Sequence, residues 1–321
     1  ISKSMNKSNE LNLLVSEKRE VAKDIFEFRF AAHDGLALPS FSPGSHIAVM
    51  TPSGANRQYS LINEGDEPRF YQIAVKLEPE SRGGSQSMHT DLSEGESLIV
   101  QSPENSFPLV EAPEYLFIGG GIGITPLISM AQFCDATRKA FRLIYCARSG
   151  EHAAYAEELK SSFGDRAVVH FDDGDPEKVY DFWDDFMSPS SAHVYCCGPK
   201  PLMDEVRALS GHWPEDQIHF EDFNPQSGKE YVNSAFTVSI KSTGDSFQVR
   251  EASTILETLR SNGLRVPSSC ESGTCGSCKM KLVSGEVEHR DFVLESNEYD
   301  SAIMVCVSRG KGDIEIDFED Y

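Results

Sequence analysis

The chain has 321 residues and carries 51 Asp and Glu against 29 Lys and Arg, which gives a formal net charge of −22. Domains usually hold about 100–200 residues, so this length accommodates two or three of them. Phosphate contacts need a basic surface, so the acidic balance argues against a protein that binds nucleic acid or docks on anionic membranes. No stretch approaches the roughly 20 consecutive apolar residues of a membrane-spanning helix, and the first residues lack the apolar core of a secretory signal. We therefore expect a cytoplasmic protein, which we take to be a monomer.

The first part of the chain alternates short β-type runs with turn residues. Glycine and Pro-Gly signals separate the runs, as is typical of antiparallel strands joined by tight turns. Strands are predicted at 11–15, 25–30, 46–50, 59–62, 70–75 and 97–100. Six short strands at this spacing predict an antiparallel β-barrel domain over residues 1–112.

The pattern changes after residue 112, where strands and helices alternate. Strands are predicted at 115–118, 141–146, 167–171, 193–196 and 218–220. Helices are predicted between them, at 127–134, 155–163, 179–187 and 202–209. This alternation predicts an α/β domain over residues 113–224, built on a parallel sheet with helical crossovers.

A polar segment with Pro and Gly, residues 225–234, has the composition of a linker. Beyond it, runs at 236–240 and 247–249 flank a turn and predict a hairpin. Thr254 and Glu257 have the spacing of a capping box, and Asn262-Gly263 predicts the end of the helix that follows. Residues 235–321 are therefore expected to form a third domain.

The strongest pattern in the sequence is a C-x4-C-x2-C run with one further cysteine, formed by Cys270, Cys275, Cys278 and Cys306. Four thiolates can hold a [2Fe–2S] cluster, two on each iron. The loop has to curl around the cluster so that its backbone N–H groups point at sulfur. Gly273 and Gly276 permit the positive-φ turns that such a loop needs.

Structural zinc is the alternative for these four cysteines. Zinc sites usually show two short C-x2-C pairs far apart, whereas here three cysteines share one loop and Cys306 is predicted alone in an apolar strand. The remaining cysteines lie in apolar runs, where buried thiols are expected: Cys134, Cys146, Cys196 and Cys197.

Two short motifs in the first domain suit a flavin. In Arg57-Gln58-Tyr59-Ser60, the Arg can fork onto a phosphate, the Tyr can stack on a flat ring and the Ser hydroxyl can reach a ring atom. The run Gly83-Gly84-Ser85 precedes a helical stretch at 86–92 and can present backbone N–H groups to a phosphate. Taken singly, these motifs also fit a half-buried strand with a surface Arg and an ordinary turn.

A glycine-rich loop follows the first strand of the α/β domain, and it includes Gly120, Gly121, Gly123, Thr125 and Pro126. It contains G-x-G-x-x-P, in which a proline at the start of the helix replaces the third glycine of a Rossmann motif. Glycines let a pyrophosphate approach the backbone closely, although a packing turn is the simpler alternative.

Cys197-Gly198-Pro199 ends another predicted parallel strand. Because parallel sheets bind ligands at the carboxyl ends of their strands, both motifs should lie on one edge of the sheet.

Together these residues resemble the ferredoxin–NADP reductase superfamily, and within it the phthalate dioxygenase reductase branch. The likeness covers nearly the whole chain. Beyond the motifs above it includes I-A-V-K-L from Ile73, H-F-E-D-F from His219 and V-P-S-S-C-E-S-G-T-C-G-S-C-K from Val266. The resemblance implies an FMN barrel, an NAD domain and a plant-type ferredoxin domain of β-grasp fold, in that order.

The resemblance also implies residue roles. Around FMN it assigns Arg57, Gln58, Tyr59, Ser60, Ile73, Ala74, Val75, Lys76, Gly83, Gly84 and Ser85. For the nucleotide it assigns Gly120, Gly121, Gly123, Thr125, Pro126, Arg148, Cys197, Gly198 and Pro199. Ser60 near flavin N5, Cys197 near the nicotinamide and Phe223 over the flavin ring would be the catalytic residues. Cys270, Cys275, Cys278 and Cys306 would hold the [2Fe–2S] cluster.

NADH is the expected donor, because Arg148 is the single cation after the second strand of the sheet and Asp172, Asp173 and Asp175 follow the third. Acidic side chains there would repel a 2′-phosphate. The resemblance implies a reductase that takes a hydride onto FMN and passes single electrons through the cluster to a Rieske-type terminal oxygenase. Three alternatives stay open: a reductase that uses FAD or NADPH for another acceptor, a redox-sensing regulatory protein, and a ferredoxin fused to an inactive scaffold.

Overall fold

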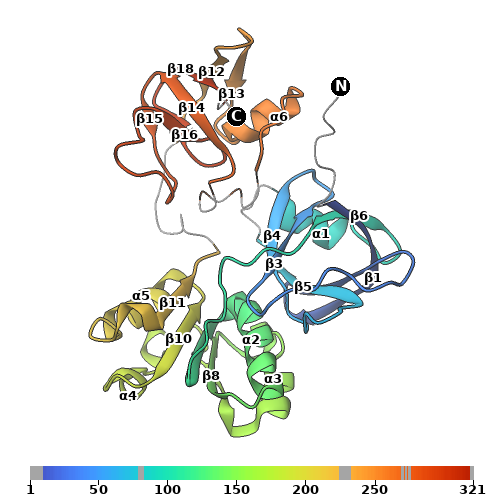
Figure 1. The fold of residues 1–321 in the computed structure, drawn as a ribbon, viewed down its shortest axis with the longest axis vertical. Helices are drawn as coiled ribbons and strands as arrows, with labels where there is room; N and C mark the ends of the chain where they lie inside the picture. The colour runs from blue at the N-terminus through green and yellow to red at the C-terminus, as the bar shows by residue number, and fades with distance from the viewer. Residues whose placement is uncertain are drawn as a thin grey trace. The chain divides into compact units, whose positions relative to one another are not determined.

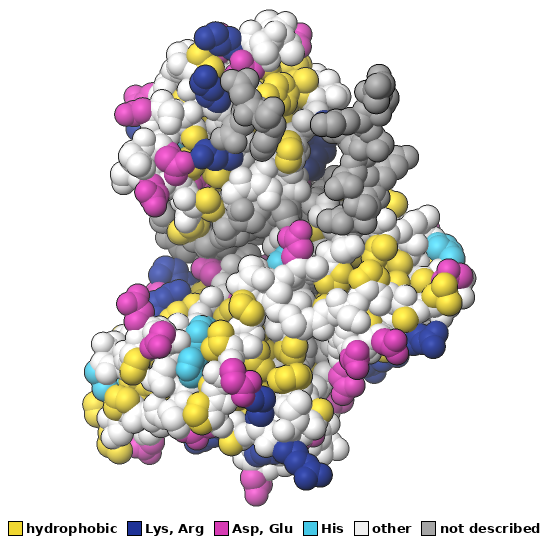
Figure 2. All heavy atoms as spheres, in the orientation of Figure 1, with side chains coloured by type: hydrophobic (Ala, Val, Ile, Leu, Met, Phe, Trp, Pro, Cys, Tyr) yellow, Lys and Arg dark blue, Asp and Glu magenta, His cyan; other side chains and the backbone are white. Residues whose placement is uncertain are grey.

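The computed structural model describes residues 10–78, 83–223, 233–268, 271, 273 and 276–318. The chain forms two compact units, Ile1–Phe223 and Asn224–Tyr321, which are described separately (Figure 1). The expected linker, 225–234, lies outside the described residues except for its last two. None of the helices in the described ranges is long and apolar enough to cross a bilayer. On the face drawn in Figure 2, acidic and basic side chains are interspersed over each unit.

The first unit begins with a six-stranded antiparallel sheet in the order β4-β3-β6-β1-β2-β5. Its strands are β1 (Glu10–Ala22), β2 (Ile25–Ala31), β3 (His46–Met50), β4 (Asn56–Ser60), β5 (Phe70–Lys76) and β6 (Ser97–Gln101). Helix α1 (Gly84–Thr90) lies between β5 and β6 in the chain. Side chains such as Phe28, Ile47 and Val100 from different strands share one core, as a barrel requires. The predicted antiparallel barrel is confirmed.

One predicted strand is misplaced, because β4 covers Asn56–Ser60 and not 59–62. Leu61 and Ile62 leave the ladder, and their N–H groups donate to the carbonyls of Ser45 and Gln72. Both side chains are buried, at 0% and 2% exposure. These two residues are therefore apolar because they are buried where the chain passes from β4 toward β5, and not because they pair in a strand.

The second half of this unit is a five-stranded parallel sheet in the order β11-β10-β7-β8-β9. Its strands are β7 (Glu114–Gly120), β8 (Ala140–Ala147), β9 (Ala167–Phe171), β10 (Ala192–Cys197) and β11 (Ile218–Glu221). The helices are α2 (Ile124–Ala136), α3 (Ala156–Phe163), α4 (Trp183–Phe186) and α5 (Lys200–Leu209). Short 3₁₀ turns occur at Gly121–Gly123, Gly150–His152, Gly164–Arg166, Pro176–Lys178 and Glu215–Gln217.

Strand order fixes where a ligand can bind to this sheet. From β7 the chain proceeds to β8 and β9 on one side, then returns to place β10 and β11 on the other. The helices that leave β7 and β10 therefore diverge, which opens a crevice at the carboxyl ends of these two strands. The predicted α/β domain is confirmed.

The helix predicted at 179–187 is wrong in length, since α4 covers only Trp183–Phe186. A 3₁₀ turn at Pro176–Lys178 precedes it, and the Asp181 carboxylate accepts a hydrogen bond from the Trp183 N–H at 2.9 Å. This side-chain bond starts the helix late, because it favours a turn before the first helical residue.

The second unit holds a five-stranded mixed sheet in the order β13-β12-β18-β14-β16. Its strands are β12 (Phe236–Ile240), β13 (Ser246–Val249), β14 (Lys279–Ser284), β16 (Ala302–Met304) and β18 (Ile314–Asp317), with a small ladder of β15 (Val287–Glu288) and β17 (Arg309–Gly310). Helix α6 (Ile255–Ser261) packs into the same core as these strands. The predicted capping box is present, with both Thr254–Glu257 bonds formed, and Gly263 follows the helix at φ +83°. One helix on a mixed sheet agrees with the expected α+β fold.

Candidate functional site

The glycine loop after β7 packs directly on the end of β10. A methyl group on Gly123 would lie 2.3 Å from the Cys197 carbonyl oxygen, and one on Gly198 would lie 2.9 Å from the Gly120 nitrogen. Gly121 has φ +53°, which glycine adopts at little cost. The two motifs that the sequence predicts at one edge of the sheet are therefore in backbone contact, at the crevice between β7 and β10.

Thr125 and Pro126 form the first turn of α2 behind this loop. The Thr125 hydroxyl donates to the Ile122 carbonyl at 3.0 Å, and its side chain is buried. Pro126 lacks the N–H group that would be unsatisfied in a first turn. The Thr125 side chain thus ties the start of α2 to the glycine loop.

Cys197 lies at the carboxyl end of β10 beside Glu221, its register partner on β11. Its thiol is fully buried, and burial followed by the Glu221 charge raises the thiol pKa well above the ordinary value. Cys197 is therefore a neutral thiol in this structure.

Glu221 is a site residue that the sequence analysis missed. Burial raises the pKa of its carboxyl group to about 8, so the group is protonated at neutral pH. Within the described residues, its Oε2 atom has no hydrogen-bond partner. The signal available in the sequence was an acidic residue two positions before Phe223, at the end of a predicted parallel strand.

Arg148 follows β8, and the turn after β9 lies against it. The Asp173 N–H donates to the Arg148 carbonyl at 2.8 Å, and a methyl group on Gly174 would lie 3.7 Å from the Arg148 Nε. The single predicted cation is thus beside the acidic turn that contains Asp172 and Asp175. Phe223, which follows β11, is 44% exposed.

On the barrel side, Arg57 on β4 lies against the start of α1. A methyl group on Gly84 would lie 3.0 Å from the Arg57 Nε, so the structure brings the two short motifs together. Gly83 has φ +85°, and the Ser85 hydroxyl accepts a hydrogen bond from the Glu78 N–H at 3.1 Å.

The other residues of the β4 motif differ in how deeply they are buried. Gln58 and Tyr59 are half-buried, and Ser60 is buried at the end of the strand. Burial raises the pKa of the Tyr59 hydroxyl, so Tyr59 stays a neutral ring at physiological pH.

The four predicted residues on β5 face different directions. Ile73 and Val75 pack in the barrel core, so only their backbone atoms could contact a ligand. Ala74 belongs to the core that also contains Tyr115 and α2 of the α/β half. Lys76 is exposed, and its Nζ pairs with Glu78 at 2.8 Å.

Two of the four predicted cluster ligands lie on neighbouring turns of the second unit. Cys278 directly precedes β14, and Cys306 lies in the turn after β16, not in a strand as predicted. Strands β14 and β16 pair, and the Val305 N–H approaches the Cys278 carbonyl at 3.4 Å. Both thiols are buried, at 3% and 1% exposure. Cys270 and Cys275 lie outside the described residues.

The loop that leads to Cys278 has the geometry that a curled cluster loop needs. Gly273 and Gly276 both have φ +81°, as predicted. Glu271, which the sequence analysis missed, is 5% exposed and accepts a hydrogen bond from Arg260 of α6 at 2.9 Å. The described part of the loop therefore fits the group that the cysteine spacing predicts.

Comparison with known proteins agrees with this arrangement. An oxidoreductase NAD-binding domain model matches residues 117–208, and a 2Fe-2S iron-sulfur cluster binding domain model matches residues 238–310. The chain is 46% identical over 306 residues to the phthalate 4,5-dioxygenase oxygenase reductase subunit of Pseudomonas putida, covering 94% of each chain. This chain belongs to the phthalate dioxygenase reductase family.

Within this family, a solved structure of phthalate dioxygenase reductase superposes with a TM-score of 0.88 at 44% identity, covering 96% of this chain and 98% of that one. It is described as a modular structure for electron transfer from pyridine nucleotides to [2Fe–2S]. The tetrachlorobenzoquinone reductase of Sphingobium chlorophenolicum is 35% identical over 314 residues, with 95% of this chain and 97% of that one covered. The present family member is accordingly an oxidoreductase of the ferredoxin–NADP reductase superfamily, with an NAD-binding domain and a [2Fe–2S] domain.

Proposed function

We propose that this protein is an NADH-dependent reductase that supplies single electrons to a Rieske-type terminal oxygenase. The observation that carries the proposal is the close packing of two glycine motifs at the carboxyl ends of β7 and β10, in a chain that also holds a [2Fe–2S] domain. Residues 1–112 bind FMN, residues 113–224 bind NADH, and residues 235–321, after a linker at 225–234, bind the cluster. When bound, FMN accepts a hydride and the cluster carries single electrons onward.

On the barrel, Arg57 and the backbone of Gly83, Gly84 and Ser85 hold the FMN phosphate. Support comes from the contact between the Arg57 side chain and Gly84, which concentrates donors at one place. Tyr59 stacks on the ring as a neutral aromatic, with Gln58 beside it. Ser60 presents its hydroxyl near N5.

On strand β5, the backbone of residues 73–75 lines the flavin ring, since the Ile73 and Val75 side chains are occupied in the barrel core. Ala74 faces the neighbouring core. Lys76 is exposed, with its charge near the phosphate side.

In the α/β half, Gly120, Gly121 and Gly123 let the pyrophosphate approach the backbone, and Thr125 and Pro126 keep the first turn of α2 in place. Gly198 and Pro199 form the opposite wall of the crevice.

The nicotinamide lies against Cys197 and Glu221 at the carboxyl edge of β10 and β11. Both groups are uncharged near pH 7, because burial raises the pKa of each. Because neither side chain is charged, the neutral ring of reduced nicotinamide can bind against them without leaving a buried charge unpaired. Phe223, exposed at the end of this edge, covers the flavin ring until the nicotinamide displaces it.

Selection of NADH over NADPH follows from the acidic turn beside Arg148. Asp172, Asp173 and Asp175 oppose the added negative charge of a 2′-phosphate there. Asp173→Asn should raise kcat/KM for NADPH several-fold relative to NADH. An unchanged ratio would remove this turn from the selection mechanism.

The acidic composition of the ferredoxin segment supports a protein acceptor, since residues 235–321 hold 15 Asp and Glu against 9 Lys and Arg. Such a surface steers a basic partner, with rates that fall as salt rises. The relative that reduces tetrachlorobenzoquinone favours a second candidate, a reductase with a small-molecule acceptor.

Cofactor content and donor preference test the proposal. The purified protein should release FMN on denaturation, contain about two irons per chain, and oxidise NADH far faster than NADPH. Its turnover with a purified Rieske oxygenase should fall steeply with salt. Turnover with quinones but with no oxygenase would favour the second candidate, and a chain without flavin would overturn the proposal.

A further inference from the structure

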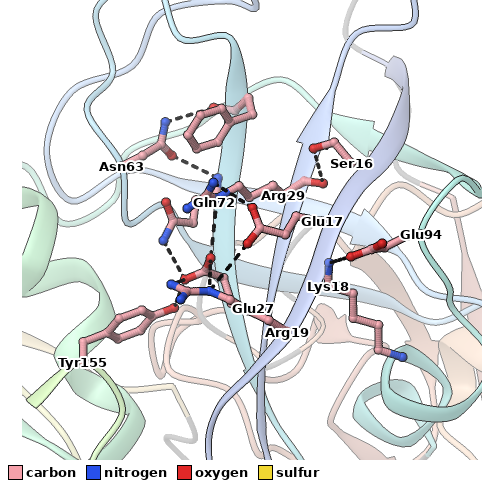
Figure 3. Close-up of polar contacts among 11 residues, drawn as sticks. Ser16, Glu17, Lys18, Arg19, Glu27, Arg29, Asn63, Gln72, Glu94 and Tyr155 are labelled. Carbon is pink, nitrogen blue, oxygen red and sulfur yellow. Dashed lines mark hydrogen bonds and ion pairs between the residues drawn. The ribbon is translucent and has the colours of Figure 1, made fainter. Parts of the chain in front are cut away.

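A buried carboxylate on the outer face of the barrel has four strong contacts. Glu27 on β2 is 0% exposed, and Arg19 of β1 donates to both of its oxygens, each at 3.0 Å. Its Oε2 also accepts hydrogen bonds at 2.8 Å from Gln72 of β5 and from the Tyr155 hydroxyl. Figure 3 shows Tyr155 reaching this group from a separate part of the fold. The first three residues belong to the barrel, whereas Tyr155 comes from the α/β half, 128 positions along the chain from Glu27.

Tyr155 is held in an uncommon backbone conformation. It occupies the N-cap position of α3 with φ +64°, a region that bulky residues rarely adopt. Its side chain is 6% exposed. The strain persists because the surroundings fix the residue. A second contact lies nearby, where the Lys23 N–H donates to the Glu151 carbonyl at 2.9 Å.

The contact joins the two segments that carry the predicted ligand residues. Glu27 pairs with Ala74 in the β2–β5 ladder, so it adjoins the strand assigned to the flavin. Tyr155 is the last residue of the segment that connects β8 to α3. This segment begins with Arg148, at the carboxyl edge of the parallel sheet. A shift of either residue therefore moves one ligand-bearing segment relative to the other.

Apolar side chains surround the Glu27–Tyr155 bond, in addition to the Lys23–Glu151 contact. Ile25 and Ala74 of the barrel share a core with Ala153, Ala154 and Tyr155. Apolar contacts of this kind are non-directional and tolerate sliding. A hydrogen bond to a carboxylate is directional and about twice as strong as one between neutral groups.

The Tyr155 hydroxyl is not required to compensate the charge. Arg19 already forms a bidentate pair with Glu27, and Arg29 lies 3.5 Å from the same carboxylate. The bond from Tyr155 therefore adds direction between the two halves of this unit rather than a counter-charge.

We propose that Glu27 and Tyr155 are positioning residues for hydride transfer, which set the register between the nucleotide-binding edge and the flavin-binding strand. The proposal rests on the function proposed above. Hydride transfer needs donor and acceptor atoms about 3–3.5 Å apart, and a misplacement of about 1 Å can cost about 10²-fold in rate. The geometry assigns neither residue a contact with the nicotinamide or the flavin.

Tyr155→Phe tests the proposal, because it removes one hydroxyl and keeps the ring. We expect the limiting rate of flavin bleaching by NADH, measured anaerobically by stopped flow, to fall about tenfold. The Kd for NADH should stay within twofold, and the isotope effect with 4-deuterated NADH should rise as hydride transfer becomes more rate-limiting.

Two further variants separate positioning from stability. Tyr180→Phe is the matched control, since its hydroxyl donates to Asp185 at 3.2 Å within the α/β half alone. Glu27→Gln replaces the carboxylate by a neutral amide, which weakens both the bond from the Tyr155 hydroxyl and the pair with Arg19. We expect Tyr180→Phe to keep its limiting rate within twofold of wild type, and Glu27→Gln to bleach more slowly, in the same direction as Tyr155→Phe.

The outcomes are distinguishable. If Tyr155→Phe bleaches as fast as Tyr180→Phe, the positioning role is refuted while the proposed function stands. If Glu27→Gln bleaches as fast as wild type, Glu27 has no positioning role and the proposal is again refuted. If NADH fails to bleach the flavin of the wild-type protein, the proposed function itself fails.

Discussion

Replacing Gly123 by alanine should separate the two walls of the nucleotide crevice. The new methyl group would lie 2.3 Å from the Cys197 carbonyl oxygen and 2.5 Å from its carbon, and both are backbone atoms that no rotamer change can move. The loop has to shift by about 1 Å before the contact reaches the 3.4 Å of ordinary packing. Overpacking of this kind costs about 1–3 kcal/mol of stability. A shift of about 1 Å at a hydride-transfer site costs about 10²-fold in rate.

The assay is anaerobic stopped-flow bleaching by NADH over a range of concentrations, with thermal melting of the same samples. Gly150→Ala is the control at the same sheet edge, because its methyl group would meet only the Phe171 ring, at 3.9 Å. We expect Gly123→Ala to bind NADH more weakly and to bleach about 10²-fold more slowly, with Gly150→Ala close to wild type. Equal behaviour of the two variants would refute the close approach of the β7 and β10 loops as the basis of the nucleotide site.

Three further predictions concern stability. Burial raises the folded-state pKa of Glu221 from 4.5 to about 8, so the folded state holds a proton that the unfolded state loses, and stability should decline as pH rises through this interval. Glu221→Gln should flatten that decline in a melting series, and an unchanged slope would contradict it. Arg260→Ala leaves the buried Glu271 carboxylate without its guanidinium partner, so this variant should lose iron to a chelator faster than wild type. Lys311→Ala removes an exposed ion pair and should lose iron at the wild-type rate. Thr254→Ala removes a capping box and should lower the free energy of unfolding by about 1 kcal/mol in urea titrations, with no change in NADH binding.

Much of the fold follows from local pattern. The alternation of strands with helices after residue 112 predicts the parallel sheet, and the capping box at Thr254 predicts the start of α6. The glycine motifs were predictable for the same reason, since glycines after a strand end mark a close approach of backbone. The structure adds the identity of the partner atoms, with Gly123 against Cys197 and Gly198 against Gly120.

The wrongly predicted strands occur where tertiary packing, and not the local sequence pattern, determines the backbone conformation. Leu61 and Ile62 resemble a strand because they are apolar, yet their burial comes from a chain crossing. Cys306 lies in a turn, because β16 ends at Met304.

The missed site residues depend on contacts between distant segments. Glu221 acquires its raised pKa from burial in an edge strand beside β10, and Glu27 acquires a role only through Tyr155. For Glu221 the sequence offers only an acidic residue at the end of a predicted parallel strand, and for the Glu27–Tyr155 contact, 128 positions apart, sequence spacing carries no signal.

The most direct test of the central claim is an anaerobic NADH titration of the purified protein, with visible absorbance and electron paramagnetic resonance recorded on each sample. The account predicts that the flavin bands bleach, that the iron–sulfur bands bleach with them, and that the signal of a reduced [2Fe–2S] centre grows with each addition of NADH. Bleaching of the flavin bands while the iron–sulfur centre stays oxidised would contradict an electron path from NADH through the flavin to the cluster.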